Sequence, residues 1–263
     1  MPIPSPIPLD NFERAIQADA EVLGMFYFGS LGRGAATRFS DLDILLWVAD
    51  DLPIPARDKL LQLLPLFGET HWLETGESDV TGFVGSEWTQ VDIELERRES
   101  LVPSPRYAGA RVMKDTDGVL ATMAAACEPE RIVETIESAT DVIHGAISDL
   151  LFLARHNARG SIWSARGNIT YQCTLTYELL GRLRGRRTYG YRYVEELLTP
   201  DEQALLTAVW PCEPTREENR RAARALWIWI QYVQREAERT LGQPLGFILD
   251  EERLLAAIDR LYE

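Results

Sequence analysis

Apolar and polar residues follow different patterns in the two halves of the chain. Short runs typical of β-strands recur up to about residue 117, whereas apolar residues at helical spacing dominate after about residue 128. We therefore expect an α/β (α+β) domain over residues 1–120 and an all-α helical bundle over residues 121–263. The junction itself is expected within residues 117–128.

The same pattern places individual elements. Asp10 followed by Glu13 has the spacing of a helix N-cap, and that helix is expected to run to about Val22. Residues 29–40 indicate a turn with room for a short helix. The other expected elements are helices over 55–67, 129–158, 165–185, 199–210 and 215–241, and strands over 25–28, 42–48, 70–74, 79–85 and 89–96.

Two further segments have a distinct composition. Prolines at positions 2, 4, 6 and 8 favour an extended arm, because proline cannot donate a backbone hydrogen bond. The Trp-rich segment 225–233 is apolar at nearly every position around a helix, so we expect it in the core of the bundle.

The net charge of the chain limits which molecules it is expected to bind. A net charge of −14 argues against a long nucleic acid, because binding a phosphate backbone needs a stripe of basic residues. The charge is compatible with a cationic partner, although acidity also simply favours solubility. No stretch has the roughly 20 apolar residues of a membrane span and the start lacks a signal pattern, so we expect a cytoplasmic protein without a membrane partner. The three cysteines are too far apart for a thiolate metal site.

Two carboxylates stand in an apolar strand within the segment MFYFGSLGRGAATRFSDLDILLWV, residues 25–48. Asp41 and Asp43 are two residues apart, so a strand directs both to one face while Leu42 and Ile44 point into the core. Two like charges held side by side are unfavourable unless a cation neutralises them or one takes up a proton. The pair therefore predicts a site for a hard cation such as Mg²⁺.

The loop before this pair has the chemistry of an anion site. Gly29, Gly32 and Gly34 let the backbone approach a ligand closely, and the Ser30 hydroxyl and backbone N–H groups are able to donate to phosphate oxygens. An anion site next to a cation site fits a nucleoside triphosphate that is bound together with Mg²⁺.

These residues resemble a known signature. Gly29-Ser30, a short loop and then Ser40 to Asp43 are similar to the G-S…D-x-D pattern of the DNA-polymerase-β-like nucleotidyltransferase superfamily. The resemblance implies a small mixed sheet with helices on one side. It also implies a nucleotide site that includes Gly29, Ser30, Arg33 and Ser40, with ATP or another nucleoside triphosphate as co-substrate.

The superfamily has a third carboxylate on a later strand. The segment TQVDIELE supplies Asp92, with Glu94 on the same face two residues on. The resemblance implies that two Mg²⁺ ions are bound. On this resemblance, Asp41, Asp43 and Asp92 would hold one ion, which would activate the attacking oxygen, and Asp41 and Asp43 would also hold the ion that accompanies the triphosphate.

Chain length, the helical second domain and the Arg-containing segments of residues 154–185 look like bacterial lincosamide and aminoglycoside nucleotidyltransferases. The resemblance to the lincosamide type is somewhat greater, because its loop-strand segment and its helical C-terminal end look similar to the corresponding segments here, the latter at residues 248–263. This implies transfer of AMP from ATP to a hydroxyl of a small, cationic antibiotic-like acceptor, with a helical substrate-binding domain. The alternatives are a protein-modifying (AMPylating) nucleotidyltransferase and a noncatalytic nucleotide-binding relative, and the three carboxylates disfavour the latter.

Several charged residues have two interpretations. Glu94 is a general base for the acceptor hydroxyl, a neighbour of the metal or a carboxylate facing water, and Glu96 on the same face is its rival as the base. Arg33 either reaches the triphosphate or is solvated.

A second D-x-D, Asp115 to Asp117, precedes a glycine between a strand and a helix, so we expect a turn there. Basic residues after helical runs either line the substrate cleft or stabilise helix C-termini, and the second role is expected for Arg159, Arg166, Arg184 and Arg187.

Overall fold

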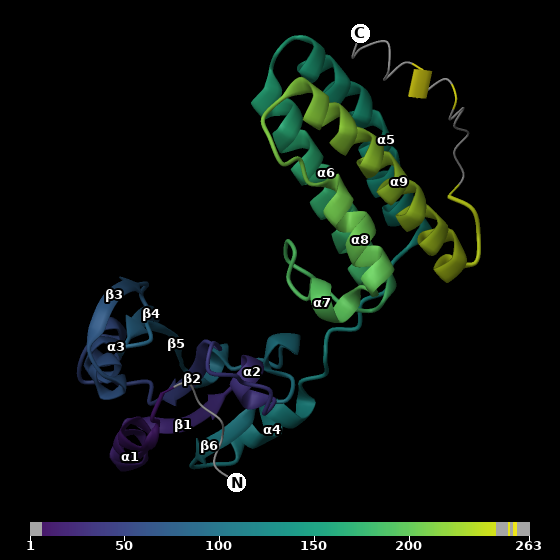
Figure 1. Ribbon diagram of the computed structural model, residues 1–263. Helices are drawn as coiled ribbons and strands as arrows, with labels where there is room; N and C mark the ends of the chain where they lie inside the picture. Colours follow the sequence, from purple (N-terminus) through teal and green to yellow (C-terminus); the bar gives the residue numbers. More distant parts are fainter. Residues whose placement is uncertain (1–6, 246–251, 253–254, 257–263) are drawn as a thin grey trace. The chain divides into compact units, whose positions relative to one another are not determined.

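The computed structural model describes residues 7–245, 252, 255 and 256. The chain divides into two compact units, residues 1–130 and 131–263 (Figure 1). The first is an α/β unit and the second is helical, so the expected fold class is confirmed. The first unit extends to residue 130, beyond the expected boundary at 120, because helix α4 (Val119–Ala126) packs against its sheet. The proline-rich start and the C-terminal helical end lie largely outside the described residues.

The described part of the first unit contains a six-stranded sheet, four α-helices and three 3₁₀ turns. The helices and turns are α1 (Asp10–Ala18), α2 (Gly29–Gly32), α3 (Ala56–Leu63), η1 (Leu64–Phe67), η2 (Arg98–Ser100), η3 (Pro105–Tyr107) and α4. The strands are β1 (Val22–Tyr27), β2 (Leu42–Val48), β3 (Thr70–Thr75), β4 (Asp79–Val84), β5 (Thr89–Glu96) and β6 (Arg111–Asp115).

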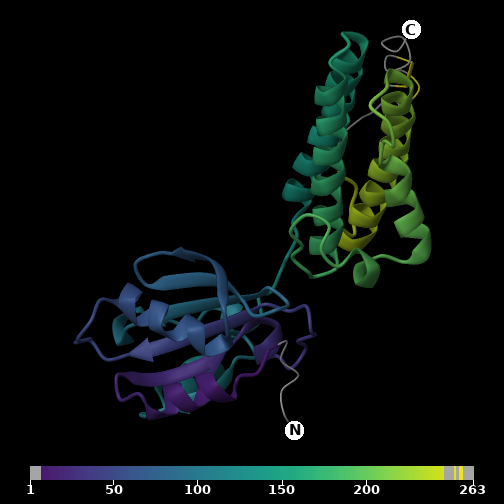
Figure 2. The same cartoon turned by 60° about the vertical axis from the view of Figure 1, so that its left-hand side comes forward.

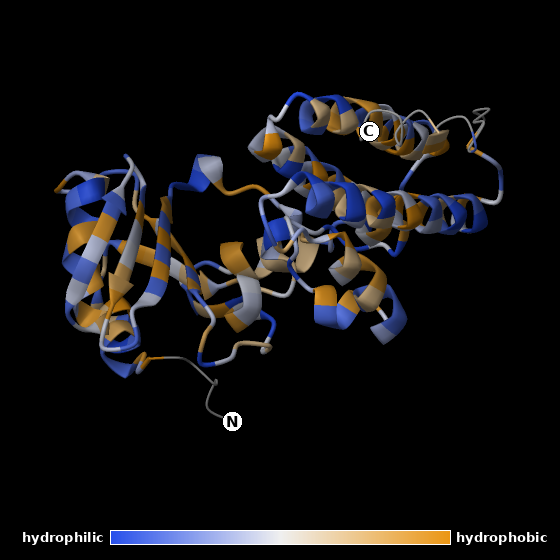
Figure 3. Ribbon diagram, turned by 45° about the horizontal axis from the view of Figure 1, so that its top comes forward, coloured by the Kyte–Doolittle hydropathy of each residue, from blue (hydrophilic) through white to orange (hydrophobic). Residues whose placement is uncertain are grey.

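The strands lie in the order β3-β4-β5-β2-β1-β6. β2 and β5 are parallel and paired from Leu42 opposite Val91 to Trp47 opposite Glu96, whereas the other neighbours are antiparallel. β3 is therefore an edge strand (Figure 1). Figure 3 shows apolar and polar bands alternating along the strands, as expected for a sheet whose two faces differ.

The two faces of the sheet carry different layers. Helices α1 and α3 and turn η1 cover one face, where the buried core includes Phe12, Ile16, Leu60, Leu64, Ile44, Leu46, Val91 and Ile93. On the other face, α4 packs Leu120 and Met123 against Leu45 and Trp47 of β2. On that second face the alternate residues of β5, Asp92, Glu94 and Glu96, are only partly buried. This leaves room for a site over β4 and β5.

Two expected helices of the first unit end earlier than the pattern predicts. α1 stops at Ala18 rather than near Val22, because the Lys114 ammonium donates to the carbonyls of Ile16 and Asp19 at its C-terminus. The expected Asp10 cap is wrong: α1 already includes Asp10 and has no side-chain cap. The expected helix over 55–67 changes to the 3₁₀ turn η1 after Leu63, where the next residue but one is a proline.

The second unit is built from three long helices and two short ones within the described residues. These are α5 (Ile136–Ala158), α6 (Ile162–Leu183), α7 (Val194–Leu197), α8 (Pro200–Val209) and α9 (Arg216–Leu241). α5, α6 and α9 pack side by side, and α8 packs on α9 (Figure 2). The Trp-rich segment lies in this core as expected, since Trp229 and Ile230 are fully buried.

Helix starts in the second unit follow side-chain caps. The expected helix from 129 begins only at Ile136, because the Thr135 hydroxyl accepts a hydrogen bond from the Ser138 backbone N–H. Thr199 caps α8 in the same way. Among the described residues, no helix is long and apolar enough to cross a membrane.

Candidate active site

Three aspartates meet on one face of the first unit's sheet. Asp43 and Asp92 are directly opposite each other on the parallel strands β2 and β5, and Asp41 immediately precedes β2. One carboxylate oxygen from each of the three lies within 4.8 Å of the others. The structure thus brings together all three carboxylates that the sequence analysis assigned to metal binding.

The middle carboxylate of the three is held in an unfavourable electrostatic environment. Burial, together with repulsion from Asp41 and Asp92, raises the pKa of Asp43 from its ordinary 3.8 to about 6. A bound cation relieves this repulsion. Carboxylate oxygens are ligands that Mg²⁺ prefers, so the donor set fits a divalent cation of this kind.

Neighbouring side chains fix the third aspartate. Asp92 accepts hydrogen bonds from the Thr81 hydroxyl at 2.5 Å and from the Gln90 amide at 2.8 Å. Thr81 lies on β4, directly opposite Asp92, whereas Gln90 lies two residues before it on β5. Each carboxylate oxygen of Asp92 therefore has one fixed donor, which orients the group toward the other aspartates.

The glycine turn adjoins the aspartates, as the sequence predicts. β1 ends at Tyr27, and the Phe28 backbone N–H donates to the Asp43 carbonyl at 3.0 Å. Gly29 follows with a φ of +58°, and a Cβ built there would lie 1.9 Å from the Asp43 Oδ2. Only glycine leaves space for this carboxylate. The next residue, Ser30, has a buried hydroxyl oxygen without a hydrogen-bond partner in the described structure, so its hydrogen-bonding capacity is unused.

The other two expected nucleotide residues have structural contacts of their own. Ser40 closes a turn, because its hydroxyl oxygen accepts a hydrogen bond from the Thr37 backbone N–H at 2.9 Å. Arg33 is exposed, and its stem lies against Gly109, where a Cβ would approach the Arg33 Cγ to 2.9 Å. Roles for both in nucleotide binding remain predictions.

Glu94 lies two residues after Asp92, on the same face of β5, and its carboxylate already has interaction partners. It forms an ion pair with Arg106 and accepts a hydrogen bond from the Tyr107 hydroxyl at 3.3 Å. Its rival Glu96 lies one pleat further, where burial and repulsion from Glu94 raise its pKa. Both carboxylates line the same cavity as Asp43 and Asp92.

A cavity of about 440 Å³ lies over this part of the sheet. Half of its lining residues are acidic, and the full lining is Asp43, Ser78, Asp79, Val80, Thr81, Asp92, Ile93, Glu94, Glu96 and Arg106. Arg106 is the one basic residue in this lining. Its guanidinium also lies over the rings of Phe28, at 5.1 Å, and Tyr107, at 5.0 Å. The cavity therefore combines a strongly negative wall with a single positioned cation.

Sequence reasoning missed four residues of this site. Gln90 could have been recognised from the sequence, because it lies two residues before Asp92 on the same strand and therefore points to the same face. Thr81, Arg106 and Tyr107 had no local signal, since their places depend on strand pairing and on the conformation of the loop after β5.

The second D-x-D has the structural role that its context predicts. Asp115 ends β6, and its Oδ2 accepts a hydrogen bond from the Ala121 backbone N–H at 2.8 Å, near the start of α4. Asp117 is exposed in the turn that follows.

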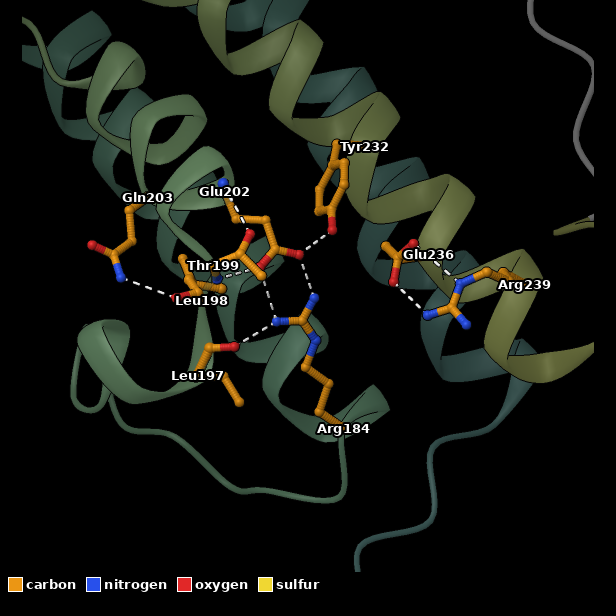
Figure 4. Close-up of polar contacts among 9 residues, drawn as sticks. All are labelled: Arg184, Leu197, Leu198, Thr199, Glu202, Gln203, Tyr232, Glu236 and Arg239. Atoms are coloured by element: carbon orange, nitrogen blue, oxygen red, sulfur yellow. Dashed lines mark hydrogen bonds and ion pairs between the residues drawn. The ribbon is translucent and has the colours of Figure 1, made fainter.

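Three of the four arginines singled out in the sequence have structural places within the helical unit. Arg159 is the C-cap of α5, and Arg166 donates to the Pro211 carbonyl at 2.6 Å. Arg184 ends α6 and forms an ion pair with Glu202 of α8, which also accepts from the Tyr232 hydroxyl of α9 (Figure 4). These contacts support the structural interpretation for the three residues; Arg187 is exposed nearby.

Comparisons with known proteins address the first unit most directly. Residues 9–94 match the family model described as a nucleotidyltransferase domain. This segment runs from α1 into β5 and contains Gly29, Ser30 and all three aspartates. A search of curated proteins finds no significant match.

Solved structures with similar chains are distant in sequence. An aminoglycoside 6-adenyltransferase from Bacillus subtilis is 11% identical, with 97% of each chain covered and a TM-score of 0.47. A nucleotidyltransferase-like protein from Exiguobacterium sibiricum is 11% identical, with 88% of this chain and 75% of that chain covered and a TM-score of 0.40. The Bradyrhizobium diazoefficiens CD-NTase CdnG, in complex with GTP, is 13% identical, with 97% and 92% covered and a TM-score of 0.27.

Each of these TM-scores is below 0.5, so the similarities do not add to the assignment. The family match lies in the segment that carries the expected G-S…D-x-D signature and the later carboxylate strand. Residues 9–94 of the first unit thus match a nucleotidyltransferase domain, in agreement with the expected DNA-polymerase-β-like superfamily.

Proposed function

We propose that the protein transfers a nucleoside monophosphate, AMP from ATP, to a hydroxyl group of a small cationic acceptor such as an aminoglycoside or a lincosamide. One observation carries the proposal: Asp41, Asp43 and Asp92 converge within 4.8 Å beside the Gly29-Ser30 turn. This arrangement offers a cation site and an anion site next to each other, as a nucleoside triphosphate with Mg²⁺ requires.

The three aspartates would hold two Mg²⁺ ions. Bound Mg²⁺ supplies charge neutralisation for the phosphates and favours loss of the acceptor's proton. The chain's own residues position the reactants: the Ser30 hydroxyl and neighbouring backbone N–H groups bind triphosphate oxygens, and Arg106 offers a positive charge beside the aspartates. Phosphoryl-type transfer depends mainly on such positioning and on electrostatic stabilisation.

The transfer itself exchanges one P–O bond for another. The acceptor oxygen forms a bond to the α-phosphorus, the bond from that phosphorus to the oxygen bridging the β-phosphorus breaks, and pyrophosphate leaves. The acceptor's proton passes to a carboxylate of the site. Glu94 is the proposed base because it lies one pleat from Asp92, with Glu96 as the alternative.

The cavity wall supports a cationic acceptor. Asp79, Glu94 and Glu96 line it, and the chain as a whole has a net charge of −14. Amine-bearing acceptors are attracted to such a surface. We place the reaction in the cytoplasm, where nucleoside triphosphates are supplied.

Product analysis tests the proposal. The protein is incubated with ATP, Mg²⁺ and a panel of aminoglycosides and lincosamides, and product masses are measured. The expected result is an acceptor whose mass has increased by one adenylyl group, together with pyrophosphate, and no product when Mg²⁺ is chelated. AMP attached to protein side chains instead would favour the protein-modifying alternative. Nucleotide binding without any product would favour the noncatalytic one.

A further inference from the structure

The sheet face that carries the aspartates also carries an aromatic pair. Trp72 of β3 is directly opposite Phe83 of β4, which in turn is opposite Gln90 of β5. Residues opposite each other on neighbouring strands share a face. Gln90 and Asp92 are two residues apart on β5, so Trp72 and Phe83 lie on the same face as Asp92 and Asp43.

The position of this pair relative to the aspartates follows from strand geometry. Phe83 is one strand away from Asp92 and displaced by two residues along it. Neighbouring strands lie about 4.8 Å apart and each residue advances about 3.4 Å, which puts the two Cα positions roughly 8 Å apart. Trp72 lies opposite Phe83 on the next strand, β3, and is therefore one strand further from Asp92. A ribose bridges a comparable gap between the α-phosphate of a nucleotide and its base.

Core packing does not account for Trp72. The side chain lies on the edge strand and is 48% exposed, and its ring meets that of Phe83 edge-on with centroids 5.6 Å apart. A large aromatic surface is thereby left open to solvent beside the acidic site, although burying it elsewhere would be favourable. Such an exposed ring is suited to stack on a planar ligand.

The two flanks of Asp92 on this face differ in chemistry. Toward Glu94 and Glu96 lies the acid-lined cavity, which suits a cationic acceptor. Toward Trp72 and Phe83 the row that these two side chains form with Gln90 is aromatic and uncharged, and the nearest carboxylate on β3, Glu74, lies two residues from Trp72 in the row of Asp92. The two substrates of the proposed reaction differ in the same way, because a nucleobase is planar and neutral whereas the acceptor is polar and cationic.

We propose that Trp72 and Phe83 form the platform that binds the base of the nucleoside triphosphate. The assignment rests on the proposed function and adds the binding site for one half of its nucleotide. Stacking on an aromatic ring tolerates different bases, since every base has a π-face. The platform therefore predicts that ATP, GTP, CTP and UTP all bind, each more tightly than the bare triphosphate chain.

Calorimetric titrations with ATP and with inorganic tripolyphosphate, both in Mg²⁺, test this platform. In Trp72→Ala, ATP affinity is expected to fall about 5- to 100-fold, the range for loss of one stacked base, while tripolyphosphate affinity stays unchanged. Trp72→Phe should keep most of the ATP affinity. The matched control is Leu73→Ala, because Leu73 is the next residue on the same strand, is 44% exposed and points to the other face. This variant should bind ATP like the unaltered protein.

The outcomes separate this inference from the proposed function. Unchanged ATP affinity in Trp72→Ala would overturn the platform while leaving the proposed reaction intact. An equal loss for ATP and tripolyphosphate would also overturn it, since the substitution would then disturb the phosphate site. A protein that binds neither ligand in Mg²⁺ would contradict the proposed function and the platform together.

Discussion

Gly29 is the residue at which local backbone geometry and the acidic site are most tightly linked. An alanine there must adopt a φ of +58° and place its Cβ against the Asp43 carboxylate. We expect Gly29→Ala to lower the free energy of unfolding by about 1–3 kcal/mol and to abolish most activity, because the carboxylate has to move. Denaturant unfolding and the rate of AMP transfer measure the two effects.

Gly34 provides the control for this substitution. Its φ is +70°, so alanine meets the same backbone cost, but no atom lies within 4 Å of a Cβ built there. Gly34→Ala should therefore lose a similar part of the stability without displacing the Asp43 carboxylate, and should retain far more activity than Gly29→Ala. If both variants lost activity equally, backbone strain in the loop would explain the effect and the close approach to Asp43 would not.

Arg106 is the second residue whose replacement tests the site. It is the basic residue of the cavity lining and forms an ion pair with Glu94. We expect Arg106→Gln to raise the KM for ATP by about 10- to 100-fold, the equivalent of one or two lost hydrogen bonds to charged groups. Arg106→Lys should recover part of the loss, because it keeps the charge.

A stability measurement and a neighbouring arginine control for this effect. The Arg106 side chain is 49% exposed, so its loss should change the free energy of unfolding by less than about 1 kcal/mol. Arg98→Gln removes an arginine that lies over Trp47 and does not line the cavity. An equal rise in KM for Arg98→Gln would show that general charge, rather than position, is responsible.

At the scale of elements, periodicity predicts what depends on one strand or helix at a time. Alternation along β5 places Asp92, Glu94 and Glu96 on one face, and the same rule places Asp41 with Asp43. The long helices α5, α6 and α9 follow from apolar residues at helical spacing. These predictions succeed because the order of apolar and polar residues within a single strand or helix determines which of its faces is buried.

Contacts between distant segments are beyond such rules. Lys114 ends α1 by binding its last carbonyls, and no pattern near residue 18 contains that information. Arg106 reaches Glu94 only because the loop after β5 folds back through η3. The parallel pairing of β2 with β5, which brings Asp43 opposite Asp92, is likewise a choice of topology that local periodicity does not contain, and the resemblance supplied only a third carboxylate on a later strand.

The helical unit contains one network with a predictable pH response. Burial opposes ionisation of Glu202, but hydrogen bonds from Arg184, Tyr232 and Thr199 lower its pKa from 4.5 to about 2 (Figure 4). Its contribution to stability is therefore full above about pH 4.5 and is lost as the pH falls toward 2, because the unfolded chain takes up the proton first. Glu202→Gln should lose about 2–4 kcal/mol at pH 7 and show a weaker acid dependence.

Urea unfolding at several pH values measures this response, and hydrogen exchange in α6 and α8 localises it. The control is Glu196→Gln, since Glu196 pairs with Arg186 at the surface with 64% of its side chain exposed. This pair should contribute less than about 1 kcal/mol. The assignment to Glu202 fails if its variant retains the full acid dependence of the unaltered protein.

At the scale of the whole molecule, the excess of negative charge makes acceptor binding sensitive to salt. Exposed charges are screened over a Debye length of about 8 Å at physiological ionic strength. We expect a polycationic aminoglycoside to lose affinity more steeply with added salt than a singly charged lincosamide, because more charge pairs are screened. Calorimetry from low to high NaCl at fixed Mg²⁺ gives the two slopes. A flat response for the polycation would mean that the acidic cavity does not attract the acceptor electrostatically.

Replacement of the central carboxylate tests the acidic site most directly. Asp43→Asn removes a charge whose raised pKa, about 6, marks it as unfavourable in the folded, metal-free protein. That cost is present above about pH 6 and absent below about pH 4, so at pH 7 the variant should unfold at the same or higher denaturant concentration. Asp117→Asn, in the exposed second D-x-D, is the matched control.

The decisive quantity is the rate of pyrophosphate release from ATP in the presence of Mg²⁺ and the acceptor panel. The unaltered protein and Asp117→Asn should turn over alike. Asp43→Asn should be slower by at least about 100- to 1,000-fold, because the lost charge neutralisation amounts to several kcal/mol of transition-state stabilisation. A folded Asp43→Asn variant that releases pyrophosphate at a near-normal rate would contradict the assignment of this site.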